Sequence, residues 1–286
     1  MISSIVVLYE PKIEEYMYIC DYYGDVDIVY VIDNSKKNNK ASVERTIIDK
    51  YNDCEKIRYF HFPENVGLCK ALNFGMSHSR KSGCDWALLM DADSSFVTNI
   101  ISVYRKKLKD INSNVAVLAP VHIHDRSKAK QYQGEKELKW AMTSGCLYNI
   151  SIFEALGGFM EELFVDGLDI DYCYKARKAG YKVIECGNAL LRHYPAATKE
   201  VVIFGKVILK YGVSSPQRYR MQARSLVWLI RRYRQFPDFV RYCWKWFKVL
   251  FFFENKKEYI KEMQAGSKEG AKLAKKQDMI HSSLDG

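Results

Sequence analysis

The sequence lacks the motifs that mark zinc proteins, dinucleotide-binding enzymes and P-loop nucleotidases. Its eight cysteines include no Cys-x-x-Cys pair and no zinc-like spacing, and several lie in apolar runs, where free thiols act as small hydrophobic side chains. No Gly-x-Gly-x-x-Gly or Walker-type loop follows the first strand-like run, residues 5–9, so neither a dinucleotide nor an ATP γ-phosphate is indicated. Internal repeats and low-complexity tracts are also absent.

Targeting and membrane-spanning signals are missing as well. The first residues lead directly into a strand-like run, without a basic region or a cleavage site. No apolar run approaches the roughly 18 residues that a membrane span requires. Together with the scattered cysteines, these absences predict a cytosolic protein with reduced thiols.

The composition is that of a globular protein with an uneven charge. The 286 residues are 48% hydrophobic and 27% charged, enough for one substantial core. The net charge is +10, and residues 199–276 carry most of the surplus, whereas the acidic residues of interest lie between residues 85 and 171. A basic region behind an acidic half indicates an anionic surface or substrate as a partner.

Strand-like and helix-like segments alternate in the N-terminal half. Strands are predicted at residues 5–9, 28–32, 57–60, 86–90 and 115–119, and helices at residues 43–51, 68–79 and 99–109. This order predicts an α/β fold with a mainly parallel sheet and right-handed crossovers. Beyond residue 216 the chain changes to helices rich in Arg, Tyr, Trp and Phe.

Two carboxylates, Asp91 and Asp93, follow the fourth predicted strand. Residues 88–90 are apolar without alternation, as expected of a strand that is covered on both faces. Ligands bind at the carboxyl end of such strands in open α/β sheets. Two acids one residue apart repel each other unless a cation lies between them, and their oxygens suit Mg²⁺ or Mn²⁺. The alternative is a solvated turn, because Asp and Ser favour turns.

Polar residues also follow the first two strands: Tyr9 with Glu10, and Asp33 with Asn34. Because these loops converge at the switch point of a doubly wound sheet, they predict a nucleotide pocket. Asp33 is a candidate acceptor for a pyrimidine N–H. Each residue has an alternative interpretation as an ordinary loop residue.

Further donor-site candidates surround the next helix. Asn65 and Asn73 are candidates for contact with a ribose or base edge, and Gly67, at the helix entrance, permits close approach of the backbone.

A second acidic cluster, Asp166, Asp169 and Asp171, lies at the start of a predicted helix over residues 168–179. Acids in a first helical turn are stabilised by the helix dipole, and this structural interpretation is favoured for Asp171. Asp169 follows an apolar approach segment and is expected beside Gly145. A carboxylate next to an acceptor hydroxyl can act as a general base.

These motifs resemble, in order and spacing, those of family 2 glycosyltransferases. The matching segments are residues 6–9, 31–35, 65–75, 89–94, 144–146, 157–159 and 169–181. The Asp-x-Asp-Ser sequence, the tripeptide Phe164-Val165-Asp166 and the arginine-rich run over residues 218–233 are similar to the rhamnosyltransferase branch.

The resemblance implies a GT-A fold, a Rossmann-like mixed sheet that binds nucleotide-diphosphate sugars, with a C-terminal helical extension. It divides the chain into a catalytic domain, residues 1–200, and a basic, aromatic, helical region, residues 201–286. Within the catalytic domain, the nucleotide-sugar half covers about residues 1–120 and the acceptor half about residues 121–200.

The resemblance also implies roles for single residues. Asp91, Asp93 and His193 would hold Mn²⁺ or Mg²⁺, Asp33 would read the base, and Asp169 would deprotonate the acceptor. The alternative for His193 is a structural histidine at a strand end, and Leu168 stands where many members have Glu or Thr. The donor-binding candidates are Tyr9, Glu10, Asp33, Asn34, Gly67, Lys70, Asn73 and Ala92. The acceptor-side candidates are Ser144, Gly145 and Asp166.

Residues 231–253 combine cations with bulky aromatic side chains. Helices of this composition can lie in the headgroup layer of a membrane. The alternative is packing against the catalytic domain or a second subunit, as in a homodimer. No known nucleic-acid-binding module is present, so nucleic acid is not an expected partner.

The sequence therefore predicts a metal-dependent, inverting glycosyltransferase of cell-surface polysaccharide synthesis, peripheral at the cytoplasmic face of the cell membrane. The expected donor is dTDP-rhamnose, with a UDP-hexose (glucosyl or galactosyl) as the alternative, and the expected acceptor is a saccharide carried on a polyprenyl diphosphate. A non-catalytic partner protein of the same fold is a second class. A nucleotidyltransferase would carry a Gly-rich loop where Glu10-Pro11 stands.

Overall fold

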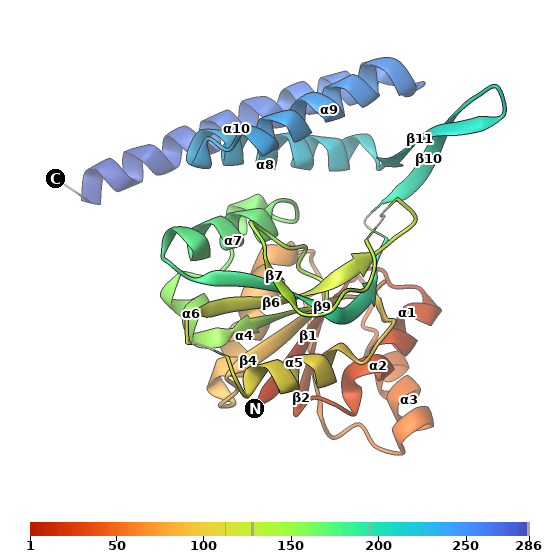
Figure 1. Cartoon of the computed structure of the whole chain (residues 1–286), viewed down its shortest axis with the longest axis vertical. Helices are drawn as coiled ribbons and strands as arrows, with labels where there is room; N and C mark the ends of the chain where they lie inside the picture. Colours follow the sequence, from red (N-terminus) through yellow and green to blue (C-terminus); the bar gives the residue numbers. More distant parts are fainter. Residues whose placement is uncertain (112, 127–128, 195, 285–286) are drawn as a thin grey trace.

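The computed structural model describes residues 1–111, 113–126, 129–194 and 196–284. Within them, a nine-stranded sheet carries helices on both faces (Figure 1). Its strands are β1 (Ile2–Leu8), β2 (Ile28–Asp33), β3 (Ile57–His61), β4 (Trp86–Asp91), β5 (Ser95–Phe96), β6 (Val115–Ile123), β7 (Glu135–Glu137), β8 (Cys146–Asn149) and β9 (Lys182–Arg192). The accompanying helices are α1 (Ile13–Tyr18), α2 (Cys20–Tyr23), α3 (Lys40–Tyr51), α4 (Leu68–Lys81), α5 (Ile100–Leu108), α6 (Ile150–Ala155), η1 (Glu161–Leu163) and α7 (Leu168–Lys178).

The strands of the N-terminal half run parallel, in the order β3-β2-β1-β4. The register pairs Asp33 with Leu8 and Asp91 with Val7. The carboxyl ends of β1, β2 and β4 therefore meet at one edge of the sheet, where ligands bind in this class of fold. The predicted α/β class is confirmed. However, β8 runs antiparallel to β4 and β6, so the sheet is mixed rather than mainly parallel.

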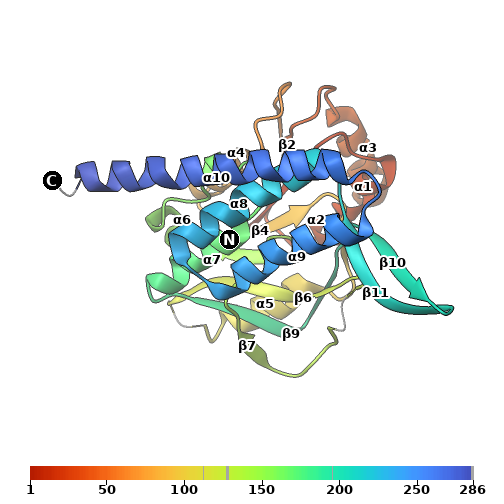
Figure 2. The ribbon, with the colours of Figure 1, turned by 90° about the horizontal axis from the view of Figure 1, so that it is seen from above.

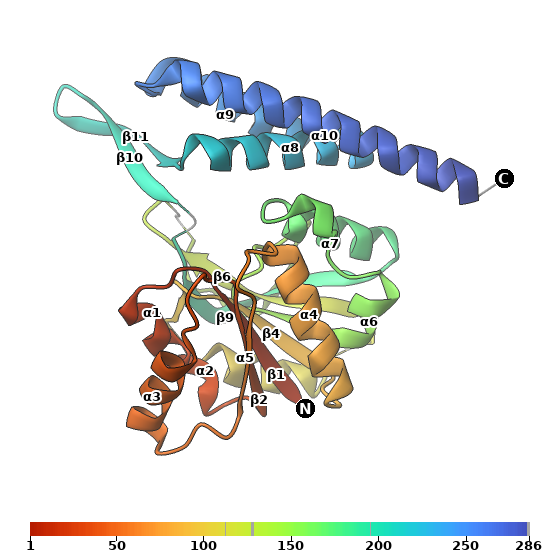
Figure 3. The ribbon, with the colours of Figure 1, turned by 180° about the vertical axis from the view of Figure 1, so that it is seen from behind.

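Alternate residues of the central strands face two separate cores. Ile5 and Leu89 pack into the core that α4, α6 and α7 cover, whereas Val6 and Met90 pack into the core under α1, α2, α3 and α5. Figure 3 shows α4 on one face of the sheet, with α5 behind it. All four side chains are buried, as expected of central strands that are covered on both faces.

The C-terminal part forms a hairpin and then a layer of three helices. The hairpin consists of β10 (Ala197–Ile203) and β11 (Lys206–Val213), and the helices are α8 (Pro216–Tyr233), α9 (Phe236–Phe252) and α10 (Lys256–Leu284). The prediction of a helical region from residue 201 is therefore wrong at its start, because the β-branched residues between 201 and 208 favour strand. The predicted domain boundary at residue 200 falls inside β10.

Two glycines hold the helical layer together. A Cβ atom on Gly266 would lie 2.1 Å from the carbonyl oxygen of Arg220, and one on Gly270 would lie 2.2 Å from that of Arg224. Only glycine therefore lets α10 pack this closely on α8, and Figure 2 shows the two helices side by side. Among the helices of the described ranges, none combines the length and the apolar character needed to cross a bilayer.

Candidate functional site

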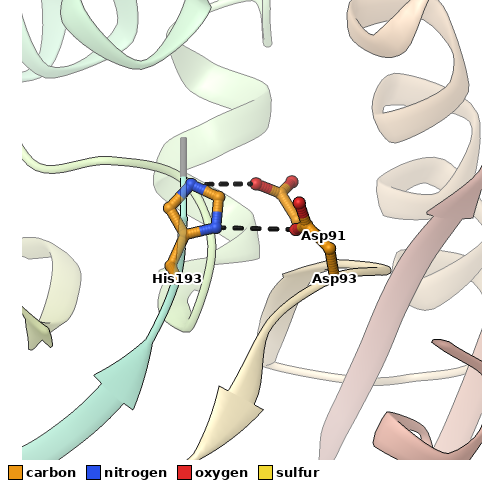
Figure 4. Close-up of side chains that lie close together, drawn as sticks. All are labelled: Asp91, Asp93 and His193. Carbon is orange, nitrogen blue, oxygen red and sulfur yellow. Dashed lines mark ion pairs between the residues drawn. The ribbon is translucent and has the colours of Figure 1, made fainter. Parts of the chain in front are cut away.

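The two acids after β4 and His193 after β9 form one cluster (Figure 4). Their ligand atoms all lie within 4.8 Å of one another. His193 Nε2 is 3.6 Å from Asp91 Oδ2, and His193 Nδ1 is 3.6 Å from Asp93 Oδ1. The antiparallel pairing of Ser95 in β5 with Arg192 in β9 produces this geometry, because it folds the turn after β4 against the end of β9.

Two buried serines form hydrogen bonds with residues of the cluster. Ser94 Oγ lies 2.9 Å from His193 Nδ1. Ser144 Oγ accepts a hydrogen bond from the backbone N–H of Asp91 (3.0 Å) and donates to Ser94 Oγ (2.8 Å). If Nδ1 carries the ring proton and donates a hydrogen bond to Ser94, Nε2 is unprotonated. Its lone pair is then available to a metal ion on the side of Asp91.

The electrostatics of the cluster favour a cation. Burial raises the pKa of Asp91, and Asp93 raises it further, while His193 acts in the opposite direction. Burial lowers the pKa of His193, but its contact with Asp93 and the charge of Asp91 outweigh that effect, so the net shift is upward. The cluster thus retains protons that a divalent cation would displace. Two carboxylate oxygens and one imidazole nitrogen fit Mn²⁺, and the carboxylates also suit Mg²⁺.

A cavity of about 1020 Å³ lies between this edge of the sheet and the helical layer. It contains nine of the predicted site residues, namely Tyr9, Asn34, Gly67, Asp91, Ala92, Asp93, Asp166, Asp169 and His193. They come from the ends of β1, β2, β4 and β9 and from the starts of α4 and α7. The structure therefore brings the acidic motif after β4 and the acidic motif at the start of α7 to the same cavity.

Asp169 lies in the first turn of α7 and faces this cavity. Its Oδ1 accepts a hydrogen bond from the backbone N–H of Ile170 (2.8 Å). Burial raises the pKa of Asp169 to about 6. A carboxylate with this pKa is ionised at neutral pH and is a stronger base than an exposed aspartate.

Asp171 has a different environment, although it is only two residues away. Its carboxylate accepts a hydrogen bond from the hydroxyl of Tyr233 (2.6 Å) and forms an ion pair with Lys175 (3.3 Å). Asp171 does not line the cavity. These contacts agree with the structural interpretation of Asp171.

Asp33, predicted to read the base, is not among the residues that line the cavity. Its carboxylate is buried and accepts hydrogen bonds from Tyr59, from the backbone N–H of Ser35 and from the backbone and side chain of Asn39. Burial acts to raise the pKa of Asp33, but these hydrogen bonds together lower it. Recognition of a nucleobase by Asp33 would require the base to replace at least one of these hydrogen bonds.

Asn34, the next residue, points its side chain toward the cavity region. Its Nδ2 donates weakly to the carbonyl of Gly67 (3.4 Å), and its Oδ1 is buried without a hydrogen-bond partner among the described residues. This acceptor oxygen is better placed than the Asp33 carboxylate to accept a hydrogen bond from an N–H or O–H group of a ligand in the cavity.

Five other predicted site residues also lie outside the cavity lining. Asn73 binds the backbone of Phe159 through both of its side-chain polar atoms, at 2.8 and 3.0 Å. Glu10 accepts a hydrogen bond from the backbone N–H of Lys36 (3.0 Å). Lys70 is exposed. Ser144 hydrogen bonds to the backbone of Asp91 and to Ser94, and the backbone N–H of Gly145 donates to the carbonyl of Leu89 (2.7 Å).

Sequence reasoning missed the wall of the cavity that the helical layer provides. Its polar members are Gln217, Arg218, Gln222, Ser225, Arg241, Lys245 and Lys248. Arg218 forms an ion pair with Asp166, with its Nε 2.9 Å from Oδ2 and its Nη2 3.1 Å from Oδ1. The density of cations in α8 and α9 is the available signal, and of the two interpretations given for this region, packing against the catalytic domain accounts for this wall.

Known proteins resemble this chain in family, sequence and fold. The model described as "Glycosyl transferase family 2" matches residues 10–165. The chain is 25% identical over 252 residues to "dTDP-rhamnosyl transferase RfbF" of Shigella flexneri, and the match covers 81% of this chain and 80% of that relative.

Two solved structures share the fold at low identity. TarS 1–349 of S. aureus in complex with UDP-GlcNAc has a TM-score of 0.56 and 14% identity, over 91% of this chain and 79% of that one. GalNAc-T7 with UDP, GalNAc and Mn²⁺ has a TM-score of 0.54 and 12% identity, over 87% of this chain and 56% of that one. The GT-A fold with C-terminal helices that the sequence predicted is confirmed.

Removal of a ligand from the cluster is expected to abolish specific Mn²⁺ binding. Asp91→Asn and His193→Ala should bind Mn²⁺ more weakly than Ser94→Ala, which should lose about 10- to 100-fold in affinity because its hydroxyl orients the imidazole. Isothermal titration calorimetry measures these affinities. Asp85→Asn is the control, because this exposed carboxylate precedes β4 and pairs with the N-terminal amino group (2.8 Å). Unchanged affinity in the Asp91 variant would exclude the cluster as the metal site.

Proposed function

The chain belongs to glycosyl transferase family 2 and is a glycosyltransferase, and on that basis we propose that it transfers a sugar, with inversion, from a nucleotide-diphosphate donor to a hydroxyl group. One observation carries the proposal. Asp169, with its pKa raised to about 6, lines the same cavity as the Asp91, Asp93 and His193 cluster. A base and a diphosphate-binding group on one cavity are what such a transfer requires.

The proposed chemistry gives each of these residues a role. A cation bound by the cluster would neutralise the charge that develops on the leaving nucleotide diphosphate. Asp169 takes the proton of the acceptor hydroxyl while that oxygen bonds to the anomeric carbon and the bond from this carbon to the diphosphate breaks. Asn34 offers its Oδ1, which has no hydrogen-bond partner in the described part of the chain, to the nucleoside part of the donor. Gly67 lines the cavity, and only glycine fits there, since a Cβ would lie 2.6 Å from the ring of Phe164.

The proposed donor is dTDP-rhamnose, and the proposed acceptor is a saccharide of a growing surface polysaccharide. The name of the Shigella flexneri relative supports the donor, at 25% identity. A UDP-hexose is the alternative donor, because the two structures of similar fold contain UDP or UDP-GlcNAc, at 12% and 14% identity. We place the reaction at the cytoplasmic face of the membrane, with the acceptor carried on a polyprenyl diphosphate.

A stripe of exposed side chains on α9 supports this membrane contact. Its members are at least 40% exposed and recur at helical spacing: Phe236, Phe239, Val240, Trp244, Phe247, Leu250 and Phe251. Exposed cations lie at both ends of α9, Arg231 and Arg234 before it and Lys256 and Lys257 after it. An apolar stripe flanked by cations is complementary to an anionic lipid surface. A second copy of the chain is the alternative occupant.

The donor is tested by turnover and by thermal stability. With Mn²⁺ present, dTDP-rhamnose should be hydrolysed slowly and should raise the melting temperature, because a ligand at 100 times its Kd stabilises a fold by about 2.7 kcal/mol. At the same concentration, UDP-glucose and UDP-galactose should not be hydrolysed and should not raise the melting temperature. Preference for a UDP-hexose would support the alternative donor. Absence of both binding and metal-dependent hydrolysis with every nucleotide sugar would support a non-catalytic partner protein.

Asp169→Asn should reduce turnover by about 10²–10⁴-fold and leave donor affinity unchanged, because the amide cannot accept the proton. Steady-state kinetics with a saccharide acceptor and donor titration calorimetry measure the two effects. Asp171→Asn is the comparison: it should lower the melting temperature by weakening the contacts with Tyr233 and Lys175, while folded protein retains its turnover. Near-normal turnover of the Asp169 variant would remove this residue from the role of base.

The activity should also fall in acid with an apparent pKa of about 6. A general base acts only when ionised, and burial raises the pKa of Asp169 to about 6, so activity is present above this pH and is lost as the pH falls through it. A plot of log(kcat/KM) against pH should rise with unit slope and then level off. The residual activity of Asp169→Asn should not show this rise with pH. An unchanged rise in the variant would mean that another group titrates.

The triple variant Phe239→Ser, Phe247→Ser, Phe251→Ser should bind anionic vesicles much more weakly than the wild type. Each ring that leaves the lipid forfeits about 1.5–3 kcal/mol of apolar burial. Sedimentation with vesicles of phosphatidylglycerol and phosphatidylcholine at low salt measures the effect. Ile13→Ser, on the exposed side of α1, is the control. A wild type that does not bind vesicles but is a dimer, and that the triple variant converts to a monomer, would make the stripe a subunit interface.

A further inference from the structure

The inner side of α9 presents two lysines to the cavity, Lys245 and Lys248. Lys248 is only 6% exposed, and its Nζ donates a hydrogen bond to the carbonyl of Gly212 (2.9 Å). Lys245 is partly buried, and its Nζ donates to Oε1 of Gln222 (2.6 Å). Both ammonium groups also lie over the ring of Tyr219, at 5.1 and 5.5 Å from its centroid. Neutral groups thus hold the two side chains in place.

Neither lysine has a carboxylate within ion-pair distance among the described residues, whereas the arginines beside them do. Arg218 pairs with Asp166 (2.9 Å), and Arg241 pairs with Asp238 (2.6 Å). Two basic side chains therefore share this wall of the cavity with no carboxylate of the described residues paired to either.

The charged groups that face the lysines come from three other segments of the chain. Asp166, before α7, attracts Lys245, while Arg218 of α8 repels it. Arg126 and Lys245 repel Lys248. Burial and these neighbours lower the pKa of Lys245 to about 8 and that of Lys248 to about 7. Burying cations in this way costs free energy, and a bound anion would restore part of it.

We propose that Lys245 and Lys248 form an anion subsite that binds a phosphate group of the acceptor. The inference rests on the proposed function and identifies the class of acceptor. It requires only binding: the ammonium groups donate hydrogen bonds to phosphate oxygens, and no bond to the phosphate is made or broken.

The position of the lysines favours the acceptor over the donor. The diphosphate of the donor has its own partner in the metal-ligand cluster at the sheet edge, whereas the lysines belong to the helical layer on another wall of the cavity. The exposed aromatic stripe lies on a different side of the same helix, because Lys245 and Lys248 fall outside its spacing. Trp244 belongs to both the stripe and the cavity wall. A phosphate at the lysines therefore lies next to the surface that an attached lipid chain would contact.

Inorganic pyrophosphate in EDTA is the probe, because chelation removes the metal-dependent site. Calorimetric titration of the full chain should detect binding, and Lys245→Gln and Lys248→Gln should each weaken it about tenfold or more, as expected on loss of a charge-assisted hydrogen bond. Lys261→Gln, an exposed lysine of α10, is the matched control and should bind as the wild type does. If Lys248→Gln does not fold, Lys245→Gln alone decides, because its side chain is partly exposed.

Three outcomes would overturn the proposal. Wild-type protein that binds no pyrophosphate in EDTA, or lysine variants that bind it normally, would exclude the subsite. Lysine variants that lose dTDP binding in Mn²⁺ would assign the lysines to the donor. Variants that lose binding to vesicles of phosphatidylglycerol and phosphatidylcholine but keep pyrophosphate binding would assign them to lipid headgroups.

Failure of the proposed function would give a different result. Asp91→Asn should lose Mn²⁺-dependent dTDP binding and keep pyrophosphate binding in EDTA. If the wild-type protein turns over no nucleotide sugar but binds pyrophosphate through these lysines, the anion subsite is supported. Its interpretation as part of a transferase is then wrong.

Discussion

The mutual repulsion of the Asp91 and Asp93 carboxylates is the constraint on which the rest of the site depends. Asp91 ends a strand whose residues 87–90 are buried, which fixes its backbone, and Asp93 lies in the turn that follows. His193 lies 3.6 Å from each of them, and although burial lowers its pKa, the two carboxylates raise it overall. A divalent cation would compensate both carboxylates more completely than a single histidine side chain could. The fold contributes rigidity: β4 lies between β1 and β8, and two buried serines fix the backbone and the imidazole.

The helical layer completes what the sheet edge begins. Residues of α8 and α9 form one wall of the cavity, opposite the strand ends. Gly266 and Gly270 bring α10 close to the backbone of α8, and α8 in turn holds Asp166 through Arg218. The layer opposes the acidic edge of the sheet with a wall that contains Arg218, Arg241, Lys245 and Lys248. A substrate in this cavity would therefore meet the carboxylates of Asp91 and Asp93 on one side and basic side chains on the other.

Particular residues show where prediction from the sequence ended. Asp33, Asn73 and Ser144 are short polar residues next to strands or helix starts, as ligand-binding residues often are. In the structure they bind Asn39 and Tyr59, the backbone of Phe159, and Ser94 with the backbone of Asp91. A sequence shows that such a side chain can hydrogen bond but not whether its partner is a ligand or its own chain, because many residues, near and distant in sequence, could be that partner. The strand at residues 197–203 is a different case, because it pairs with the adjacent strand β11 in a hairpin and local β-branched residues signal it.

The sequence by itself determined the features that depend on neighbours along the chain. Apolar runs without alternation gave the buried strands, their polar ends gave Asp91 and Asp93, and the helix start after Gly167 gave Asp169. Tertiary structure alone decided which of these residues share a cavity. His193 reaches the two acids through the pairing of β5 with β9, and Lys248 reaches the cavity because α9 folds back over the sheet edge. His193 is 102 residues from Asp91, and Lys248 is 157 residues from it. Such contacts form only when burial of the two cores and of the helical layer offsets the chain entropy that long closures lose.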